Sequence, residues 1–156
     1  MPSKILFVCL GNICRSPAAE GVFRTLMPEA ETDSAGTSGW HENEPPYPAM
    51  QSAARKRGVD ISDLRARRFL AADFNRFDLI VGMDADTLAA IEAQRPSGNA
   101  TPVRLLTEFA PETGAEVTAG YEFDVPVRFD TDRIQTSVAS FQAGDVPNVP
   151  VVEVRV

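Results

Sequence analysis

Apolar runs and stretches with helical spacing alternate along the chain, and each kind of stretch predicts one kind of element. The first run, "KILFVCL", is apolar almost throughout, as expected for a central strand that is buried on both faces. Two later runs, "FDLIVGM" and "TPVRLL", have the same character, and "TDSAGTSG" is a shorter candidate strand. The predicted strands are therefore residues 4–10, 32–39, 77–83 and 101–106.

Helical patterns fill most of the intervals between these strands. After the first strand, Ser16 is a candidate helix cap and Pro17 is a candidate first helical residue. Apolar residues then follow at helical spacing at positions Ala19, Val22, Phe23 and Leu26. The other predicted helices are 45–58, which Gly58 ends, and 84–95, which stops before Pro96 and turns Leu88 and Ile91 inward.

Strands that alternate with helices predict an α/β fold with right-handed crossovers. We expect a doubly wound, four-stranded parallel sheet with helices on both faces. The length of 156 residues and a hydrophobic content of 44% fit one domain spanning residues 1–156. Ligands of such sheets bind beyond the carboxyl ends of the strands, so the loop after the first strand is the favoured site.

Charge and cysteine content narrow the classes of function. The net charge of −7 and the lack of a dense basic cluster argue against nucleic acid as a partner. The apolar run near the N-terminus is too short for a signal peptide or a membrane span, which predicts a cytoplasmic protein without a membrane partner. Two cysteines in a reducing compartment suggest chemistry or redox sensing, although a buried free cysteine is the ordinary alternative.

The loop "CLGNICRS" combines a thiol with groups that bind anions. Cys9 ends the first strand, where the N–H groups and dipole of the next helix favour a thiolate and can also cradle a phosphate. Arg15 follows six residues later, far enough for its guanidinium to curl over an anion beside the sulfur. Gly11 and Asn12 tolerate positive φ angles, and the Ser16 hydroxyl can donate to the sulfur. The alternatives are that Cys9 is an ordinary buried cysteine at the end of a strand and that Arg15 is an ordinary surface arginine.

Competing chemistry fits the sequence poorly. The nucleotide-binding pattern that ends in Gly-Lys lacks its lysine, and no Gly-x-Gly-x-x-Gly follows the first strand. Two cysteines and the single His41 do not supply the four ligands of a closed metal site. We therefore expect neither a metal nor another cofactor.

The segment "VCLGNICRSP" resembles the signature loop of the low molecular weight protein tyrosine phosphatases. The segments "AEGVFR", "DSAGTSGWHENEPP", "ARKRGVDISDLRARRF", "DFNRFDLIVGMDADTL" and "VRLLTEF" follow in the family's order, so the similarity covers about residues 4–109. The resemblance implies hydrolysis of phosphotyrosine in proteins through a cysteinyl-phosphate on Cys9, with Arg15 as the phosphate-binding cation. Inorganic phosphate and other oxyanions are then expected inhibitors. The implied phosphate-binding residues are Leu10, Gly11, Asn12, Ile13, Cys14, Arg15 and Ser16.

The resemblance also implies roles for residues other than the nucleophile. Trp40 and His41 match the segment that lines the family's substrate cleft, and Asn12 and Ser34 look like its loop-bracing residues. Cys14 is the implied redox partner of Cys9 in a reversible disulfide, with a passive loop residue as the alternative. Asp84 either braces the site or caps the following helix.

The tail departs from the family pattern from about residue 121. The family's Asp-Pro-aromatic motif is missing after "DVP", and the chain reads Val127 and Arg128 there instead. In the family, an aspartic acid in this region protonates the leaving oxygen and later activates water. Asp124 is our candidate for this general acid, with Asp130 second. Tyr47 and Ala49 also depart from the family pattern, so substrate specificity does not carry over, and the pattern leaves the fold of the tail open.

Two other functions compete with phosphatase activity. A thioredoxin-coupled arsenate reductase has a similar fold and loop but needs further cysteines, and none follows Cys14. A phosphate-binding module that lost turnover with its altered tail is a rival from another class. Hydrolysis of para-nitrophenyl phosphate without added metal distinguishes the three.

Overall fold

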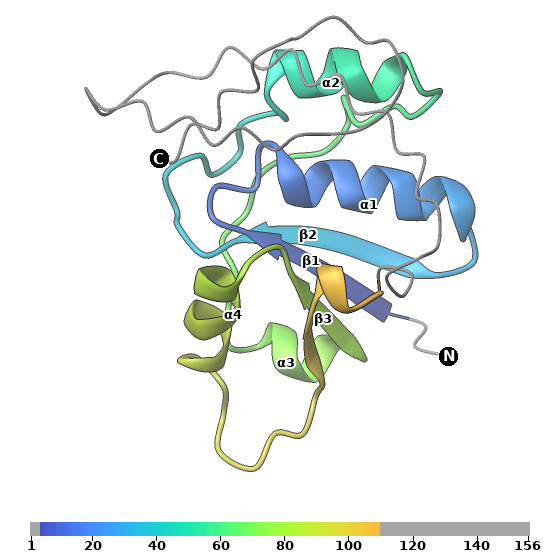
Figure 1. Ribbon diagram of the computed structural model, residues 1–156. Coiled ribbons are helices and arrows are strands. Elements are labelled where there is room, and N and C mark those ends of the chain that lie inside the picture. Colours follow the sequence, from blue (N-terminus) through green and yellow to red (C-terminus); the bar gives the residue numbers. More distant parts are fainter. Residues whose placement is uncertain (1–3, 110–156) are drawn as a thin grey trace, which may run out of the picture. The chain divides into compact units, whose positions relative to one another are not determined.

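A computed structural model describes residues 4–109 of the chain. This region has an α/β fold, in which a parallel sheet is flanked by helices. Figure 1 shows the strands at the centre, with α1 and α2 on the same side of them. The elements in chain order are β1 (Lys4–Cys9), α1 (Arg15–Leu26), β2 (Glu31–Gly36), α2 (Pro48–Arg55), α3 (Asp73–Arg76), β3 (Leu79–Gly82), α4 (Ala85–Glu92), β4 (Val103–Leu105) and the 3-10 helix η1 (Leu106–Phe109).

The four strands lie in the order β2-β1-β3-β4, and all pairs are parallel. The chain starts in the middle of the sheet and winds outward in both directions, which confirms the predicted doubly wound topology. Because β1 is central, its carboxyl end lies between the ends of β2 and β3, with Cys9 opposite Gly36 and Val8 opposite Gly82. This edge is where such sheets bind ligands.

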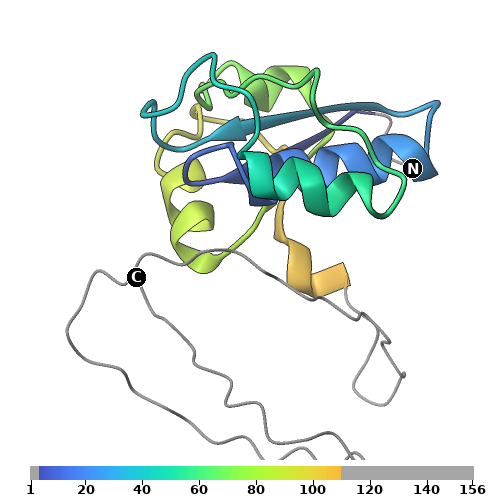
Figure 2. The same cartoon turned by 90° about the horizontal axis from the view of Figure 1, so that it is seen from above.

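Successive residues of β1 point to opposite faces of the sheet, and helices cover both faces. On one face, Leu6 and Val8 pack in a buried cluster with Phe74 of α3 and Ile91 of α4. On the other face, Ile5, Phe7 and Val81 pack against residues of α1. Figure 2, viewed from above, shows α1 and α2 beside each other on one side of the strands and α3 on the other. This arrangement explains the continuous apolar character of the first run.

The elements differ from the sequence predictions mainly at their ends. α2 begins at Pro48 because Tyr47, the residue before the proline, is extended at φ −52° and ψ 133°. α4 begins after Asp84 and ends at Glu92, three residues before the predicted end. The pattern predicted neither α3 nor η1. Each of these two elements spans four residues, too short for an amphipathic repeat.

The apolar residues at helical spacing in α1 do not all face the core. Val22 and Leu26 are exposed, with 45% and 70% of their surface accessible, and Phe23 packs against Phe7 with ring centroids 5.7 Å apart. The residues of α1 that are buried are Ser16, Pro17, Glu20 and Gly21. A methyl group on Gly21 would come within 2.3 Å of the Ile61 side chain, so the helix packs closely on the segment after α2.

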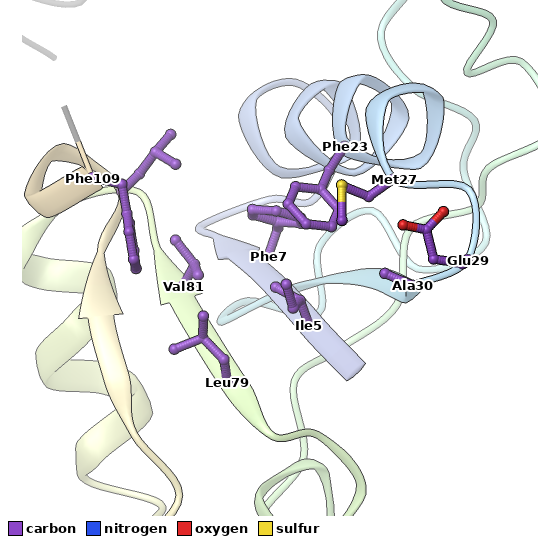
Figure 3. Close-up of a pocket in the computed structure, with 10 residues that line it drawn as sticks. Ile5, Phe7, Phe23, Met27, Glu29, Ala30, Leu79, Val81 and Phe109 are labelled. Atoms are coloured by element: carbon purple, nitrogen blue, oxygen red, sulfur yellow. The ribbon is translucent and has the colours of Figure 1, made fainter. Parts of the chain in front are cut away.

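An apolar groove of about 560 Å³ lies beside α1, away from the end of the sheet that carries Cys9. Figure 3 shows Ile5 and Phe7 of β1 and Leu79 and Val81 of β3 on its floor, with Phe109 at one side. None of the residues that line this groove belongs to the loop between β1 and α1. In residues 4–109, no helix is long and apolar enough to cross a membrane.

Candidate active site

Cys9 is the last residue of β1, and its sulfur is buried against the loop that follows. The backbone N–H of Asn12 donates to the sulfur at 3.2 Å, and the Ser16 hydroxyl oxygen lies 3.0 Å from it. Both contacts come from residues close in sequence, because the chain reverses between the end of β1 and the start of α1. Two polar groups therefore converge on one thiol.

Asn12 organises this loop from its centre. It is 2% exposed and adopts a φ of 55°, a left-handed conformation that asparagine tolerates better than most residues. Its side-chain Nδ2 donates to Ser16 Oγ and to Ser34 Oγ, each at 2.9 Å. Its Oδ1 accepts the backbone N–H of Arg67 at 2.9 Å. The same residue therefore shapes the backbone and ties it to β2 and to the segment before α3.

The segment after β2 braces the loop from outside. Backbone N–H groups of Thr37 and Ser38 donate to the carbonyls of Cys9 and Leu10 at 2.9 Å, and the Tyr47 N–H donates to Ile13 at 2.8 Å. This close approach requires a glycine at position 36. A Cβ atom there would come within 2.8 Å of the Leu10 carbonyl oxygen.

The prediction that Ser16 caps α1 was wrong. The helix begins at Arg15 after Cys14, and no side chain caps its N-terminus. Ser16 instead turns inward toward the sulfur and is fully buried. Within the described part of the chain, the N–H groups of Gly11, Ile13 and Cys14 have no hydrogen-bond acceptor. Uncapped donors at the start of a helix are suited to bind an anion.

Arg15 supplies the positive charge of the site and is paired with Asp84. Its Nη1 donates to Asp84 Oδ2, and both side chains are partly exposed. Asp84 also caps α4, because its Oδ1 accepts the N–H of Thr87 at 2.7 Å. Asp84 thus performs both of the roles considered for it. Partial burial alone would raise the pKa of Asp84, but hydrogen bonds from Thr87 and Arg15 lower it to about 2.

Trp40 and His41 lie in the turn after β2. Trp40 is 76% exposed, so its ring is available to a ligand rather than packed in the core. His41 pairs with Glu44 at 2.8 Å, and its ring edge would meet a Cβ on Gly11 at 3.2 Å. The His41 ring therefore borders the loop that carries Cys9.

Cys14 lies at the other end of the loop and is half-buried as a free thiol. Burial raises the pKa of Cys14, and the neighbouring Cys9 raises it further, while Arg15 opposes both effects. A thiol with a raised pKa is a weaker nucleophile at neutral pH than an ordinary cysteine. Cys14 is therefore less reactive at neutral pH than an ordinary exposed cysteine.

Three residues of the site were not predicted from the sequence. Glu20 accepts a hydrogen bond from Ser34, Arg67 fixes the Asn12 side chain through its backbone, and Gly36 permits the approach of Leu10. No local sequence signal marks these three residues, because their partners in the site are brought near by the fold. The acid candidates Asp124 and Asp130 lie outside the described residues.

The arrangement suits a phosphate or another oxyanion. The loop between β1 and α1 brings backbone donors and a helix N-terminus to the thiol, and Arg15 at the start of α1 adds a guanidinium, which together are groups that bind tetrahedral anions. In residues 4–109, no three His, Cys, Asp or Glu side chains are grouped so that they could hold a metal ion. Arg15 and the start of α1 contribute positive potential to the described site.

Several known proteins are similar to this chain in sequence and in fold. A Streptomyces coelicolor low molecular weight protein-tyrosine-phosphatase is 41% identical over 133 residues, covering 81% of this chain and 77% of that protein. The crystal structure of YfkJ from Bacillus subtilis matches with a TM-score of 0.67 and 34% identity, covering 71% of this chain and 74% of YfkJ. The tyrosine phosphatase Wzb from Escherichia coli K30, solved in complex with sulphate, matches with a TM-score of 0.60 and 29% identity, covering 65% and 71% of the two chains. The profile described as "Low molecular weight phosphotyrosine protein phosphatase" matches residues 4–139, and the chain belongs to this family.

Proposed function

We propose that Cys9 is the nucleophile of this tyrosine phosphatase and that residues 10–16 bind the phosphoryl group of its substrate. The observation that carries the proposal is the convergence of two donors on one sulfur. Asn12 donates its backbone N–H to the sulfur, and Asn12 Nδ2 occupies a lone pair of Ser16, so the Ser16 hydrogen is left to donate. Donors directed at a sulfur stabilise the negative charge that it carries before attack and after departure.

The reaction proceeds in two displacements at phosphorus. In the first, the Cys9 thiolate attacks phosphorus, the bond to the phenolic oxygen breaks, and a cysteinyl-phosphate forms. Arg15 and the loop N–H groups stabilise the three equatorial oxygens during this transfer. In the second, water attacks phosphorus, the phosphorus–sulfur bond breaks, and the thiolate and inorganic phosphate are released. The contacts of Asn12 and Ser16 with the sulfur assist the second step, because sulfur is then the leaving group.

The proton for the phenolic oxygen requires a separate acid. Asp84 is unsuited to this role because a carboxyl group with a pKa of about 2 is ionised at neutral pH, and its charge is engaged by Arg15. We assign the role to Asp124, which directly precedes Val-Pro in the sequence, with Asp130 as the second candidate. The same carboxylate would accept a proton from water in the second displacement.

Phosphotyrosine-containing proteins are the proposed substrates, and inorganic phosphate and other oxyanions are the proposed inhibitors. The sulphate complex of the related Wzb supports the second point, because sulphate has the shape of phosphate. The proposal includes the cytoplasmic location expected from the sequence, since both thiols of the chain are free. We propose neither nucleic acid nor a membrane as a partner of this protein.

Substitution of the nucleophile tests the proposal. We expect wild-type protein to hydrolyse para-nitrophenyl phosphate in the presence of a metal chelator, and Cys9→Ser to abolish turnover. The variant should still bind inorganic phosphate, measured by calorimetry, because the loop donors and Arg15 are unchanged. Retained binding also shows that the variant is folded. Appreciable turnover by Cys9→Ser would exclude this mechanism, and a wild-type protein that binds phosphate without turnover would be a binding module.

A further inference from the structure

Glu20 is a buried carboxyl group that the reaction described above does not use. It lies on α1 with 5% of its surface exposed, and its Oε2 accepts the Ser34 hydroxyl at 2.6 Å. Among residues 4–109, no basic nitrogen forms an ion pair with it. Burial raises the pKa of Glu20 and the Ser34 hydrogen bond lowers it; of the charged groups around it, Asp33 and Asp63 raise the pKa and Arg24 lowers it. Burial of a carboxyl group that has no ion-pair partner is unfavourable, so the presence of Glu20 inside the protein requires an explanation.

The hydrogen bonds around Asn12 have a defined direction. The Arg67 N–H must face an oxygen, so it fixes the Asn12 amide with Oδ1 toward Arg67 and Nδ2 toward the two serines. Each of the two Nδ2 hydrogens is donated to one serine oxygen. Ser16 and Ser34 therefore both act as acceptors toward Asn12, and each keeps one hydrogen to donate.

The two remaining hydrogens have different acceptors. Ser34 donates to Glu20 at 2.6 Å, and Ser16 lies 3.0 Å from the Cys9 sulfur and 3.4 Å from the Ala35 carbonyl. A continuous series of hydrogen bonds therefore runs from the Glu20 carboxyl group to the reactive sulfur. Among the described residues, Glu20 is the only acceptor of the Ser34 hydroxyl hydrogen.

The geometry of Asn12 depends on this series. Its positive φ is an unfavourable conformation for a residue with a side chain, and surrounding contacts have to maintain it. One of those contacts is Ser34, whose hydroxyl is in turn oriented by Glu20. If Ser34 turns away, the Asn12 side chain loses one of its three partners, and the backbone N–H that points at Cys9 is less firmly held.

We propose that Glu20 is a positioning residue that acts through Ser34 and Asn12 to aim two donors at the Cys9 sulfur. The inference rests on the proposed role of Cys9. Its effect falls on the second displacement, in which water bonds to phosphorus, the phosphorus–sulfur bond breaks and sulfur takes the electron pair. Donors fixed in place before the step stabilise this charge without reorganisation.

Pre-steady-state kinetics test the proposal with the full chain. With para-nitrophenyl phosphate, Glu20→Ala should slow breakdown of the cysteinyl-phosphate by about 10-fold, the usual effect of leaving a buried hydrogen-bonding group without its partner. The variant should therefore show a larger burst of para-nitrophenol than the wild type, and intact-mass measurement should detect more phosphorylated protein. Glu20→Gln keeps an acceptor oxygen for Ser34 and should break down the intermediate at nearly the wild-type rate. Glu20→Leu, which keeps volume but has no acceptor, repeats the test if Glu20→Ala does not fold.

Two comparisons separate positioning from general destabilisation. Val59→Ala removes buried volume beside Gly21 of α1 without touching the hydrogen bonds, so it should lower the melting temperature and leave the burst unchanged. Ser34→Ala should slow breakdown as Glu20→Ala does, and the double variant should be no slower than either single one, because the two residues act in series.

Several results would overturn the proposal. Multiplicative effects of the two substitutions, unchanged breakdown in Glu20→Ala, or a loss in Glu20→Gln as large as in Glu20→Ala would each exclude positioning through the acceptor oxygen. Failure of the proposed nucleophile looks different, because no phosphorylated protein would then form in the wild type or in any variant.

Discussion

The ion pair between Arg15 and Asp84 should stabilise the folded protein by an amount that depends on pH, and the free energy of unfolding of Asp84→Asn measures this amount. Asp84→Asn removes the charge that Arg15 contacts, while asparagine remains a good cap for α4 through the Thr87 N–H. A pKa lowered from 3.8 to about 2 corresponds to about 2.5 kcal/mol at 1.36 kcal/mol per pH unit. The hydrogen bonds from Thr87, which the asparagine cap keeps, account for part of this shift. Because 40% of the Asp84 side chain and 49% of the Arg15 side chain are also exposed to solvent screening, the share that belongs to the ion pair is about 1 kcal/mol.

The sign follows from the direction of the pKa change. The folded protein holds the pKa of Asp84 below its unfolded value, so the stabilisation is complete above about pH 4 and is lost as the pH falls toward 2. We expect Asp84→Asn to lower the free energy of unfolding by about 1 kcal/mol at neutral pH, or the melting temperature by about 2–4 °C. The difference from wild type should begin to shrink below about pH 4 and approach zero as the pH falls toward 2.

Urea unfolding from about pH 7 down to about pH 2.5 measures this difference. Asp86→Asn is the matched control, because Asp86 also lies in the first turn of α4 but is not the residue that Arg15 contacts. Subtracting the change in unfolding free energy of Asp86→Asn from that of Asp84→Asn removes the contribution that any acid in this turn makes through the helix dipole. A constant difference between Asp84→Asn and wild type at every pH would refute the reasoning, since a lost ion pair has to disappear when the carboxylate is protonated.

Three further predictions concern the loop and the tail. Peroxide inactivation should be reversed by dithiothreitol in the wild type and recover to a smaller fraction of starting activity in Cys14→Ser; equal recovery would make Cys14 a passive loop residue. Gly36→Ala should lower stability by about 1–3 kcal/mol and raise KM for aryl phosphates, because its Cβ would press on the Leu10 carbonyl; an unchanged KM would contradict that contact. Asp124→Asn should slow an aryl phosphate with a poor leaving group by about 100-fold or more and a good one far less, and should flatten the high-pH limb of the rate profile. Equal losses for both substrates, or none, would remove Asp124 from the mechanism.

The sequence by itself determined the fold class and the position of the reactive loop. The first apolar run fills both faces of a central strand, so its composition alone indicates burial on two sides. The thiol, the glycine, the asparagine and the arginine lie within seven residues, from Cys9 to Arg15. Local chemistry of this kind is visible without tertiary information because the residues that cooperate are also neighbours in the chain.

The tertiary structure decided which polar residues support that loop. Ser34, Arg67 and Asp84 come from segments 22 to 69 residues away from their partners in the loop, and no periodicity connects them to it. The residues that α1 buries differ from its apolar pattern for the same reason. An apolar pattern identifies residues that gain by leaving water, whereas Ser16 and Glu20 are buried because their hydrogen bonds are satisfied by residues that only the fold brings near.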